Sequence, residues 1–106
     1  MLTTIQKCFE ANKVLYTTHA RREMQQEEHG TITESEVTDT VQNSEIIEIY
    51  KNTKPYPSFL LCGKTIEGKP FHIVLAYCEE DDVIIIITVY QPDPARWVDY
   101  KRRRKK

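Results

Sequence analysis

The chain has 106 residues, a length that suits one compact domain built around a single core. Hydrophobic residues make up 40% and charged residues 29%, as in an ordinary globular protein. No apolar run approaches the roughly 20 residues that cross a membrane, and the first residues lack the pattern of a secretory signal. We therefore expect a cytoplasmic protein with no membrane partner.

The formal net charge of −1 conceals an uneven distribution. Six of the fifteen basic residues form the terminal run 101–106, which leaves nine against sixteen acids in the rest of the chain. Such a run binds polyanions, because each neutralised phosphate releases a counterion. The alternative is a solvated terminus that keeps the protein soluble. We divide the chain into one domain, residues 1–100, and a basic C-terminal tail, residues 101–106.

The first half of the chain has helical patterns. Apolar side chains three and four residues apart predict a short amphipathic helix over residues 2–12, and residues 14–16 then form an extended link. A threonine at 17 or 18 caps a second helix that runs to about Glu28 and stops at Gly30. The segment Thr33-Glu34-Ser35-Glu36 is a capping box, which predicts a third helix from Thr33 to about Asn43.

The second half has strand patterns. Segments rich in β-branched and aromatic residues predict four strands over residues 45–50, 58–63, 71–77 and 83–90. Their connections are short enough for hairpins. The expected fold class is α+β, with the N-terminal helices packed on one face of a four-stranded antiparallel sheet. After residue 90 a Pro-Asp-Pro segment ends the last strand, and residues 95–97 begin a terminal helical turn.

The acidic turn 79–82 sets an expected register for the last two strands. It pairs Cys78 with Val83, and counting from that pair gives the faces of the sheet. One face then carries Phe71, Ile73, Thr88 and Tyr90, and the other carries His72 and Val89. A one-residue change of register would exchange the two faces.

The second helix carries a first candidate site. His19 and Arg21 or Arg22 fall in its first turn, where backbone amides and the helix dipole favour an anion. Positive side chains are unfavourable there unless something anionic lies among them. His19, Arg22 and Glu23 share one face, and histidine exchanges protons near neutral pH, which suits a general base. The alternative is an ordinary surface helix with His19 and the arginines in solvent.

A second candidate site lies at the end of the last strand. Thr88 and Tyr90 are polar members of an apolar strand, and hydroxyls at a strand end can donate to a phosphate; the alternative is two ordinary strand formers. Arg96 and Trp97 either provide a stacking surface for a base or close the core. His72 is more easily explained as a hydrogen-bonded histidine of the sheet than as a catalytic one.

Cysteine and histidine spacing argues against a metal or a disulfide framework. Cys8, Cys62 and Cys78 are odd in number and far apart, which is typical of buried free thiols. The three histidines at 19, 29 and 72 lack ligand spacing. We expect no metal and no cofactor.

Five segments together resemble a known group of proteins: HARREM, ITESEV, IIEIY, GKPFHIVLAY and IIIITVYQPDPARW. In this order they are similar to small bacterial domains of unknown function that are grouped with RelE-type and MqsR-type toxins. The resemblance covers roughly residues 16–97. One difference is that the arginine of that pattern directly precedes the methionine, whereas Glu23 holds this place here.

The resemblance implies a barnase-like and RelE-like ribonuclease fold and the role of toxin in a type II toxin–antitoxin pair. The implied reaction is metal-independent cleavage of mRNA by attack of the ribose 2′-hydroxyl on the neighbouring phosphate. His19 would be the base or acid, Arg22 or Arg21 the phosphate clamp, and Thr88 and Tyr90 positioning donors.

The implied partners are RNA, free or on the ribosome, and a cognate antitoxin, which in several relatives carries a zinc-finger domain. Further RNA contacts are expected from Arg96, Trp97, Lys101, Arg102 and Arg103. A long hydrophobic strand edge favours self-association as a homodimer. The alternatives are a non-catalytic RNA-binding or protein-interaction module of the same fold, and a catalytic domain with another nucleotide substrate.

Overall fold

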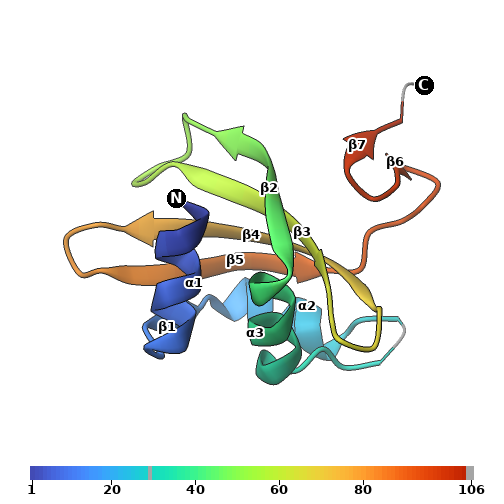
Figure 1. Ribbon diagram of the computed structural model, residues 1–106, viewed down its shortest axis with the longest axis horizontal. Coiled ribbons are helices and arrows are strands. Elements are labelled where there is room, and N and C mark those ends of the chain that lie inside the picture. The colour runs from blue at the N-terminus through green and yellow to red at the C-terminus, as the bar shows by residue number, and fades with distance from the viewer. Residues whose placement is uncertain (29, 105–106) are drawn as a thin grey trace.

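The structure is a computed structural model that describes residues 1–28 and 30–104. The described chain forms three helices, a five-stranded sheet and a two-stranded hairpin. The helices are α1 (Leu2–Glu10), α2 (Thr18–Gln25) and α3 (Glu34–Gln42). The strands are β1 (Val14–Tyr16), β2 (Ser44–Tyr50), β3 (Ser58–Lys64), β4 (Pro70–Cys78), β5 (Val83–Tyr90), β6 (Trp97–Val98) and β7 (Arg102–Arg103). Figure 1 shows the helices gathered along the sheet, with the β6–β7 hairpin beyond the end of β5.

The α+β fold class is confirmed, but the prediction of a four-stranded, fully antiparallel sheet is wrong. Strands β2 to β5 pair antiparallel as neighbours, and β1 adds a fifth, parallel strand beside β5 in the order β1-β5-β4-β3-β2. Residues 14–16, expected as a link, are that strand. Three residues are too few to show an alternating pattern, so the sequence does not reveal this strand.

Both expected helix caps form. Thr33 accepts a hydrogen bond from the Glu36 amide at 3.1 Å, and the Glu36 carboxylate accepts from the Thr33 amide at 3.0 Å, which confirms the capping box. Thr17 caps α2 by accepting from the Ala20 amide at 3.1 Å. Helix α2 ends at Gln25 rather than near residue 28. No described helix has the length and apolar character needed to cross a membrane.

The segment after β5 does not begin a helix, contrary to the expectation. Residues 94–96 form a turn, and Trp97 begins β6, which pairs with β7. The Asp93 carboxylate accepts from the Ala95 amide at 2.8 Å and so holds the turn. The backbone amides and carbonyls of β6 form their hydrogen bonds with β7, instead of the internal hydrogen bonds that a helix would have made. Part of the basic run is therefore folded as a strand, while residues 105–106 lie outside the described residues.

Two β-bulges decide which side chains face the hairpin. In β5 the extra residue is Ile87, because Val74 pairs with Thr88 and Leu75 with Ile86. In β2 the extra residue is Ile47. A bulge shifts the register by one residue and so moves every later side chain to the other face.

The β5 bulge overturns the expected faces of the last two strands. Cys78 does pair with Val83, but beyond the bulge His72 lies opposite Tyr90, and Ile73 opposite Val89. His72 and Tyr90 therefore share one face. The β2 bulge acts in the same way and brings Glu48 opposite Leu60.

The helices bury one face of the sheet. The side chains at this interface come from all three helices and from the central strands, and include Ile5, Phe9, Ala20, Met24, Val37, Val41, Leu61, Phe71, Ile73, Leu75, Ile84, Ile86 and Val89. Because side chains alternate along a strand, His72 points to the opposite face. That face is where the C-terminal hairpin packs, as its contacts with His72 show.

Gly63 allows α3 to end directly against β3. A Cβ atom at this position would lie 2.7 Å from the Thr40 carbonyl oxygen and 2.9 Å from the Asn43 carbonyl oxygen. Both neighbours are backbone atoms at the turn from α3 into β2, so neither can move aside without moving the helix end.

Gly63→Ala should therefore lower the free energy of unfolding by about 1 to 3 kcal/mol, the usual cost of overpacking. The matched control is Lys64→Ala, an exposed neighbour in β3, which should change it by less than about 0.5 kcal/mol. Urea unfolding followed by circular dichroism measures both. Equal stability of the two variants would contradict this close approach.

Candidate functional site

The hairpin closes one end of the sheet through its tryptophan. Trp97 is 5% exposed and packs nearly perpendicular to the His72 ring, with the ring centres 4.5 Å apart. Burial of this side chain against the sheet gives the hairpin an apolar anchor. Trp97 thus covers this face of the sheet and closes the core there, which is one of the two roles that the sequence left open.

His72 is fully buried and bonded at both ring nitrogens. Its Nε2 lies 2.5 Å from the Tyr100 carbonyl oxygen, and its Nδ1 lies 3.1 Å from the Tyr90 hydroxyl. A carbonyl can only accept, so we assign the proton to Nε2, which leaves Nδ1 to accept from Tyr90. Burial lowers the pKa of His72, which favours this neutral form.

Arg103 is held from two sides. Its Nε and Nη2 each donate to the Glu48 carboxylate at 3.0 Å, and its guanidinium lies 4.7 Å from the centre of the Trp97 ring. The hydrogen bond from Arg103 lowers the pKa of Glu48 below its usual range. The Tyr50 hydroxyl also donates to Glu48. Strand β2 therefore holds β7 in place through a paired carboxylate and guanidinium.

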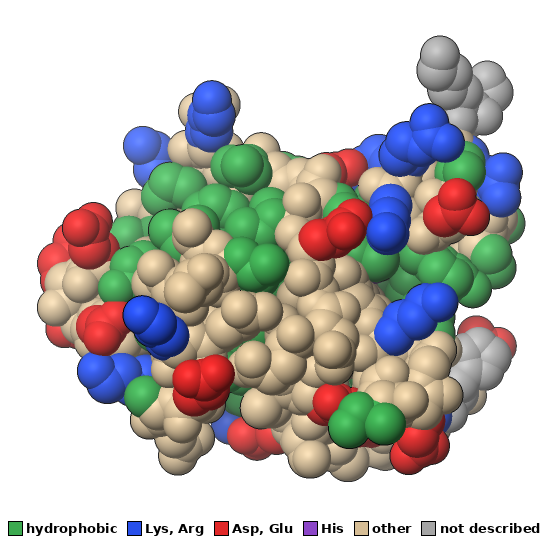
Figure 2. Space-filling model, viewed as in Figure 1, with side chains coloured by type: hydrophobic (Ala, Val, Ile, Leu, Met, Phe, Trp, Pro, Cys, Tyr) green, Lys and Arg blue, Asp and Glu red, His purple; other side chains and the backbone are tan. Residues whose placement is uncertain are grey.

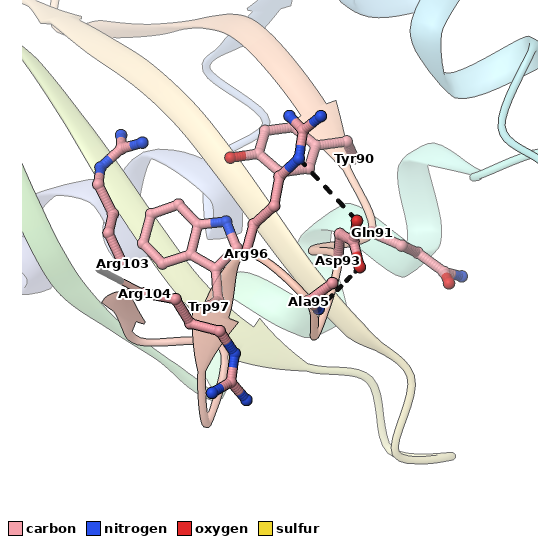
Figure 3. A pocket seen from close by; sticks show the side chains of 8 residues that line it. All are labelled: Tyr90, Gln91, Asp93, Ala95, Arg96, Trp97, Arg103 and Arg104. Atoms are coloured by element: carbon pink, nitrogen blue, oxygen red, sulfur yellow. Dashed lines mark hydrogen bonds and ion pairs between the residues drawn. The ribbon is translucent and has the colours of Figure 1, made fainter. Parts of the chain in front are cut away.

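A cleft of about 890 Å³ opens beside these contacts. It is lined by Tyr90, Gln91, Asp93, Ala95, Arg96, Trp97, Arg103 and Arg104, whose side chains are drawn in Figure 3. Three arginines and one aspartate carry its charge. Figure 2 shows Lys and Arg side chains gathered over the hairpin, although the molecule as a whole is slightly acidic.

The cleft arginines differ in how firmly they are held. Arg104 Nε donates to the Pro94 carbonyl at 2.8 Å, and its backbone amide donates to the Arg96 carbonyl at 2.8 Å. Arg96 is 83% exposed and lies 4.0 Å from Asp93, at the outer limit of an ion pair. Arg104 is thus fixed at the rim of the cleft, and the Arg96 guanidinium is largely in solvent.

Glu23 joins α2 to the free edge of β5. Its Oε1 accepts from the Thr88 hydroxyl at 2.7 Å and from the Val89 amide at 3.2 Å, and it lies 3.4 Å from His19 Nε2. Strand β1 covers this edge of β5 only as far as Ile86, so Glu23 satisfies an amide that β1 does not reach. The residue that stands in place of the expected arginine therefore has a structural role.

The basic cluster of the second helix is divided in the fold. Arg21 donates to Glu34 at 2.9 Å and lies over the Tyr16 ring at 5.1 Å. His19 is 67% exposed beside Glu23, and Arg22 is exposed on the surface of α2. Arg21 therefore reaches from α2 to the first residue of α3, whereas His19 and Arg22 face solvent.

The predicted site residues thus fall into three groups. Tyr90, Arg96, Trp97 and Arg103 meet in the cleft, while His19, Arg21, Arg22 and Thr88 belong to the surface around α2. Lys101 lies outside the cleft, 3.4 Å from Glu45, and Arg102 lines a smaller hollow with Val98. Sequence reasoning did not place Arg104, His72 or Glu48 at the site. A lone carboxylate within the apolar segment IIEIY was the available signal for Glu48.

The described cysteines are free thiols, as expected, and all three are buried. In the part of the chain that the structure describes, no three His, Cys, Asp or Glu side chains gather as a set of metal ligands. Of the three histidines, residue 29 lies outside the described residues.

Glu23→Ala should lower the free energy of unfolding by about 1 to 3 kcal/mol, because it leaves the Val89 amide and the Thr88 hydroxyl without their acceptor. Gln25→Ala, an exposed change in the same helix, is the control and should be nearly neutral. Denaturant unfolding compares the two. If both variants were equally stable, Glu23 would not anchor the β5 edge.

His72 should make stability depend on pH below neutrality. The unfolded chain takes up a proton at a pKa of about 6.5, whereas burial lowers the pKa of the folded ring. The unfolded state then binds more protons, so stability falls as the pH drops from about 6.5 towards the folded pKa, by at most about 1.4 kcal/mol per pH unit. His72→Gln removes this contribution. Unfolding free energies of both proteins between pH 7.5 and 5 test this, and a constant difference between them would contradict it.

Comparison with known proteins adds a family but no activity. A family model for a domain of unknown function, DUF4258, matches residues 16–91. The matched segment includes α2, α3 and β2 to β5, and leaves out α1 and the β6–β7 hairpin. No curated protein and no solved structure matches the chain. Because the match covers well over half of the 106 residues, the chain belongs to the DUF4258 family.

Proposed function

We propose that this protein binds single-stranded RNA in the C-terminal cleft and cleaves it without a metal, as the toxin of a toxin–antitoxin pair. One observation carries the proposal: three arginines surround Tyr90 and Trp97 in one open cleft. Planar guanidinium groups pair with phosphate oxygens through two parallel hydrogen bonds. Aromatic rings and guanidinium planes stack on exposed bases, which a single strand offers and a duplex does not.

The proposed reaction is attack of a ribose 2′-hydroxyl on the adjacent phosphorus. The 2′-oxygen forms a bond to phosphorus and loses its proton, while the bond to the 5′-oxygen breaks and that oxygen takes up a proton from water in the open cleft. The products are a 2′,3′-cyclic phosphate and a 5′-hydroxyl. The enzyme must supply a base, an acid and cations for the charge on the phosphoryl oxygens.

Tyr90 is the base that the cleft geometry favours. Its hydroxyl donates to His72 Nδ1, so the lone pairs of its oxygen remain available on the cleft side. Tyr90 would take the 2′-hydroxyl proton while its own proton moves to His72. Burial raises the pKa of Tyr90 and lowers that of His72. The tyrosinate–imidazolium pair is therefore disfavoured before the reaction, and His72 becomes charged only as both protons move with the attacking 2′-oxygen.

Arginines would stabilise the developing charge. Arg104 is fixed by the Pro94 carbonyl through Nε, which leaves its terminal nitrogens for phosphoryl oxygens. Arg96 is exposed and free to close over a bound strand. This division of roles differs from the one that the resemblance implies, in which His19, Arg22 and Thr88 act with Tyr90.

The toxin role rests on the resemblance to RelE-type and MqsR-type toxins. Support comes from the order of elements, since the three helices precede the four antiparallel strands β2 to β5 and pack on one face of the sheet. We also propose that the protein has a RelE-like fold, that its RNA is either free or on the ribosome, and that a cognate antitoxin is its partner.

A non-catalytic RNA-binding module is the second candidate, and one observation favours it. The hydrogen bonds of Tyr90, His72 and Tyr100 are mutually satisfied, as in a purely structural network. In that case the cleft would bind a strand and leave it intact.

Cleavage of labelled single-stranded RNA in excess EDTA tests the first candidate. Wild type should yield a 2′,3′-cyclic phosphate, and Tyr90→Phe should slow cleavage by about 10²- to 10⁴-fold, the usual contribution of a general base. Binding should change little, because the phenyl ring remains. His19→Ala, on the surface of α2, is the matched control and should cleave like wild type.

Two results would contradict this assignment. Loss of cleavage in His19→Ala, with Tyr90→Phe still active, would move the chemistry to α2. Absence of cleavage by wild type, with and without ribosomes, would leave only the binding module, which a salt-dependent RNA affinity would then identify.

A further inference from the structure

Arg103 combines exposure with unusually firm anchoring. Its side chain is 64% exposed, yet three contacts fix its orientation: two hydrogen bonds to Glu48 and the stack on Trp97. Exposed arginines ordinarily sample many rotamers, and ordering one costs conformational entropy. Here the contacts within the fold already hold the guanidinium in one orientation, so binding a ligand would cost little of this entropy.

The anchoring leaves one surface of Arg103 available. On one side the guanidinium lies over the Trp97 ring, 4.7 Å from its centre, and its Nε–Nη2 edge is occupied by the Glu48 carboxylate. The opposite side is open, since 64% of the side chain is exposed, and Arg103 is one of the residues that line the cleft (Figure 3). What remains is a planar surface rather than a free hydrogen-bonding edge.

Such a surface suits a base better than a phosphate. A phosphate that used the paired edge of Arg103 would have to displace Glu48, whose carboxylate already makes the bidentate contact. A base needs only the open face, because bases stack on guanidinium planes as they do on aromatic rings. Arg96 and Arg104 remain for the phosphates on either side.

We propose that the outer face of Arg103 is a stacking platform for one nucleobase, formed by the layers Trp97 and Arg103 and held by Glu48. The platform rests on the proposed RNA binding and deepens it, because it makes the ligand a base-bearing single strand rather than any polyanion. Arg103 is a substrate-positioning residue in this account: it places the strand so that a ribose lies beside Tyr90.

The tryptophan supplies the readout. Trp97 is the only tryptophan in the chain, and the Arg103 guanidinium lies directly over its ring. A base stacked on Arg103 should therefore change the fluorescence of Trp97. The ligand is a short 2′-O-methyl oligonucleotide, which cannot be cleaved by 2′-hydroxyl attack. A second oligonucleotide has the same phosphates but abasic sites in place of the bases.

Wild type should bind the base-bearing strand at least about five-fold more tightly than the abasic strand, the lower end of the range for stacking one base. Arg103→Lys keeps the charge and loses the plane, so it should bind both strands alike with an unchanged salt slope. Arg102→Lys, the exposed neighbour in β7, is the matched control and should keep the preference.

Each contrary result has a distinct meaning. Equal binding of the two strands by wild type would overturn the platform and leave the cleft as a polyanion site. A preference that survives in Arg103→Lys would also overturn it, since the base would stack elsewhere. No binding of either strand by wild type would overturn the proposed RNA binding together with the platform.

Discussion

The buried His72 is the constraint on which the C-terminal half of the site depends. Its two ring nitrogens are bonded to Tyr90 of β5 and to the backbone of Tyr100 in the β6–β7 turn, and Trp97 packs on its ring. A buried polar ring without these partners would cost on the order of 1 to 3 kcal/mol for each unsatisfied group. The contacts that satisfy the histidine therefore also hold the hairpin against the sheet. Two of its partners, Tyr90 and Trp97, line the cleft.

The electrostatic character of the cleft depends on which of its arginines are paired with a carboxylate and which are not. Glu48 neutralises Arg103 and fixes its orientation, while Arg96 is largely in solvent. An acidic body would repel a nucleic acid at long range, whereas the arginines act locally, within about a Debye length of 8 to 10 Å. In the proposed function, recognition of RNA would then depend on short-range stacking and hydrogen bonding at the hairpin more than on the net charge of the chain.

The parts of the structure that sequence predicted are those set by neighbouring residues. The capping box at Thr33 and the pairing of Cys78 with Val83 depend on a few adjacent positions, and both are present. The bulges at Ile47 and Ile87 have no such local signal, because neither position carries a glycine. Each bulge exchanged the faces of a strand end, and so the pairing of His72 with Tyr90 could not be read from alternation alone.

The candidate site was predicted in part for the same reason: the residues after β5 were named, but their contacts across the sheet were not. Chemical-shift mapping by NMR with a 2′-O-methyl RNA strand tests the central claim, that ligand binds at the hairpin cleft, most directly. We expect the largest shifts at the Trp97 indole and at the amides of Tyr90 and Arg104. Shifts confined to α2, around His19 and Arg22, would contradict it.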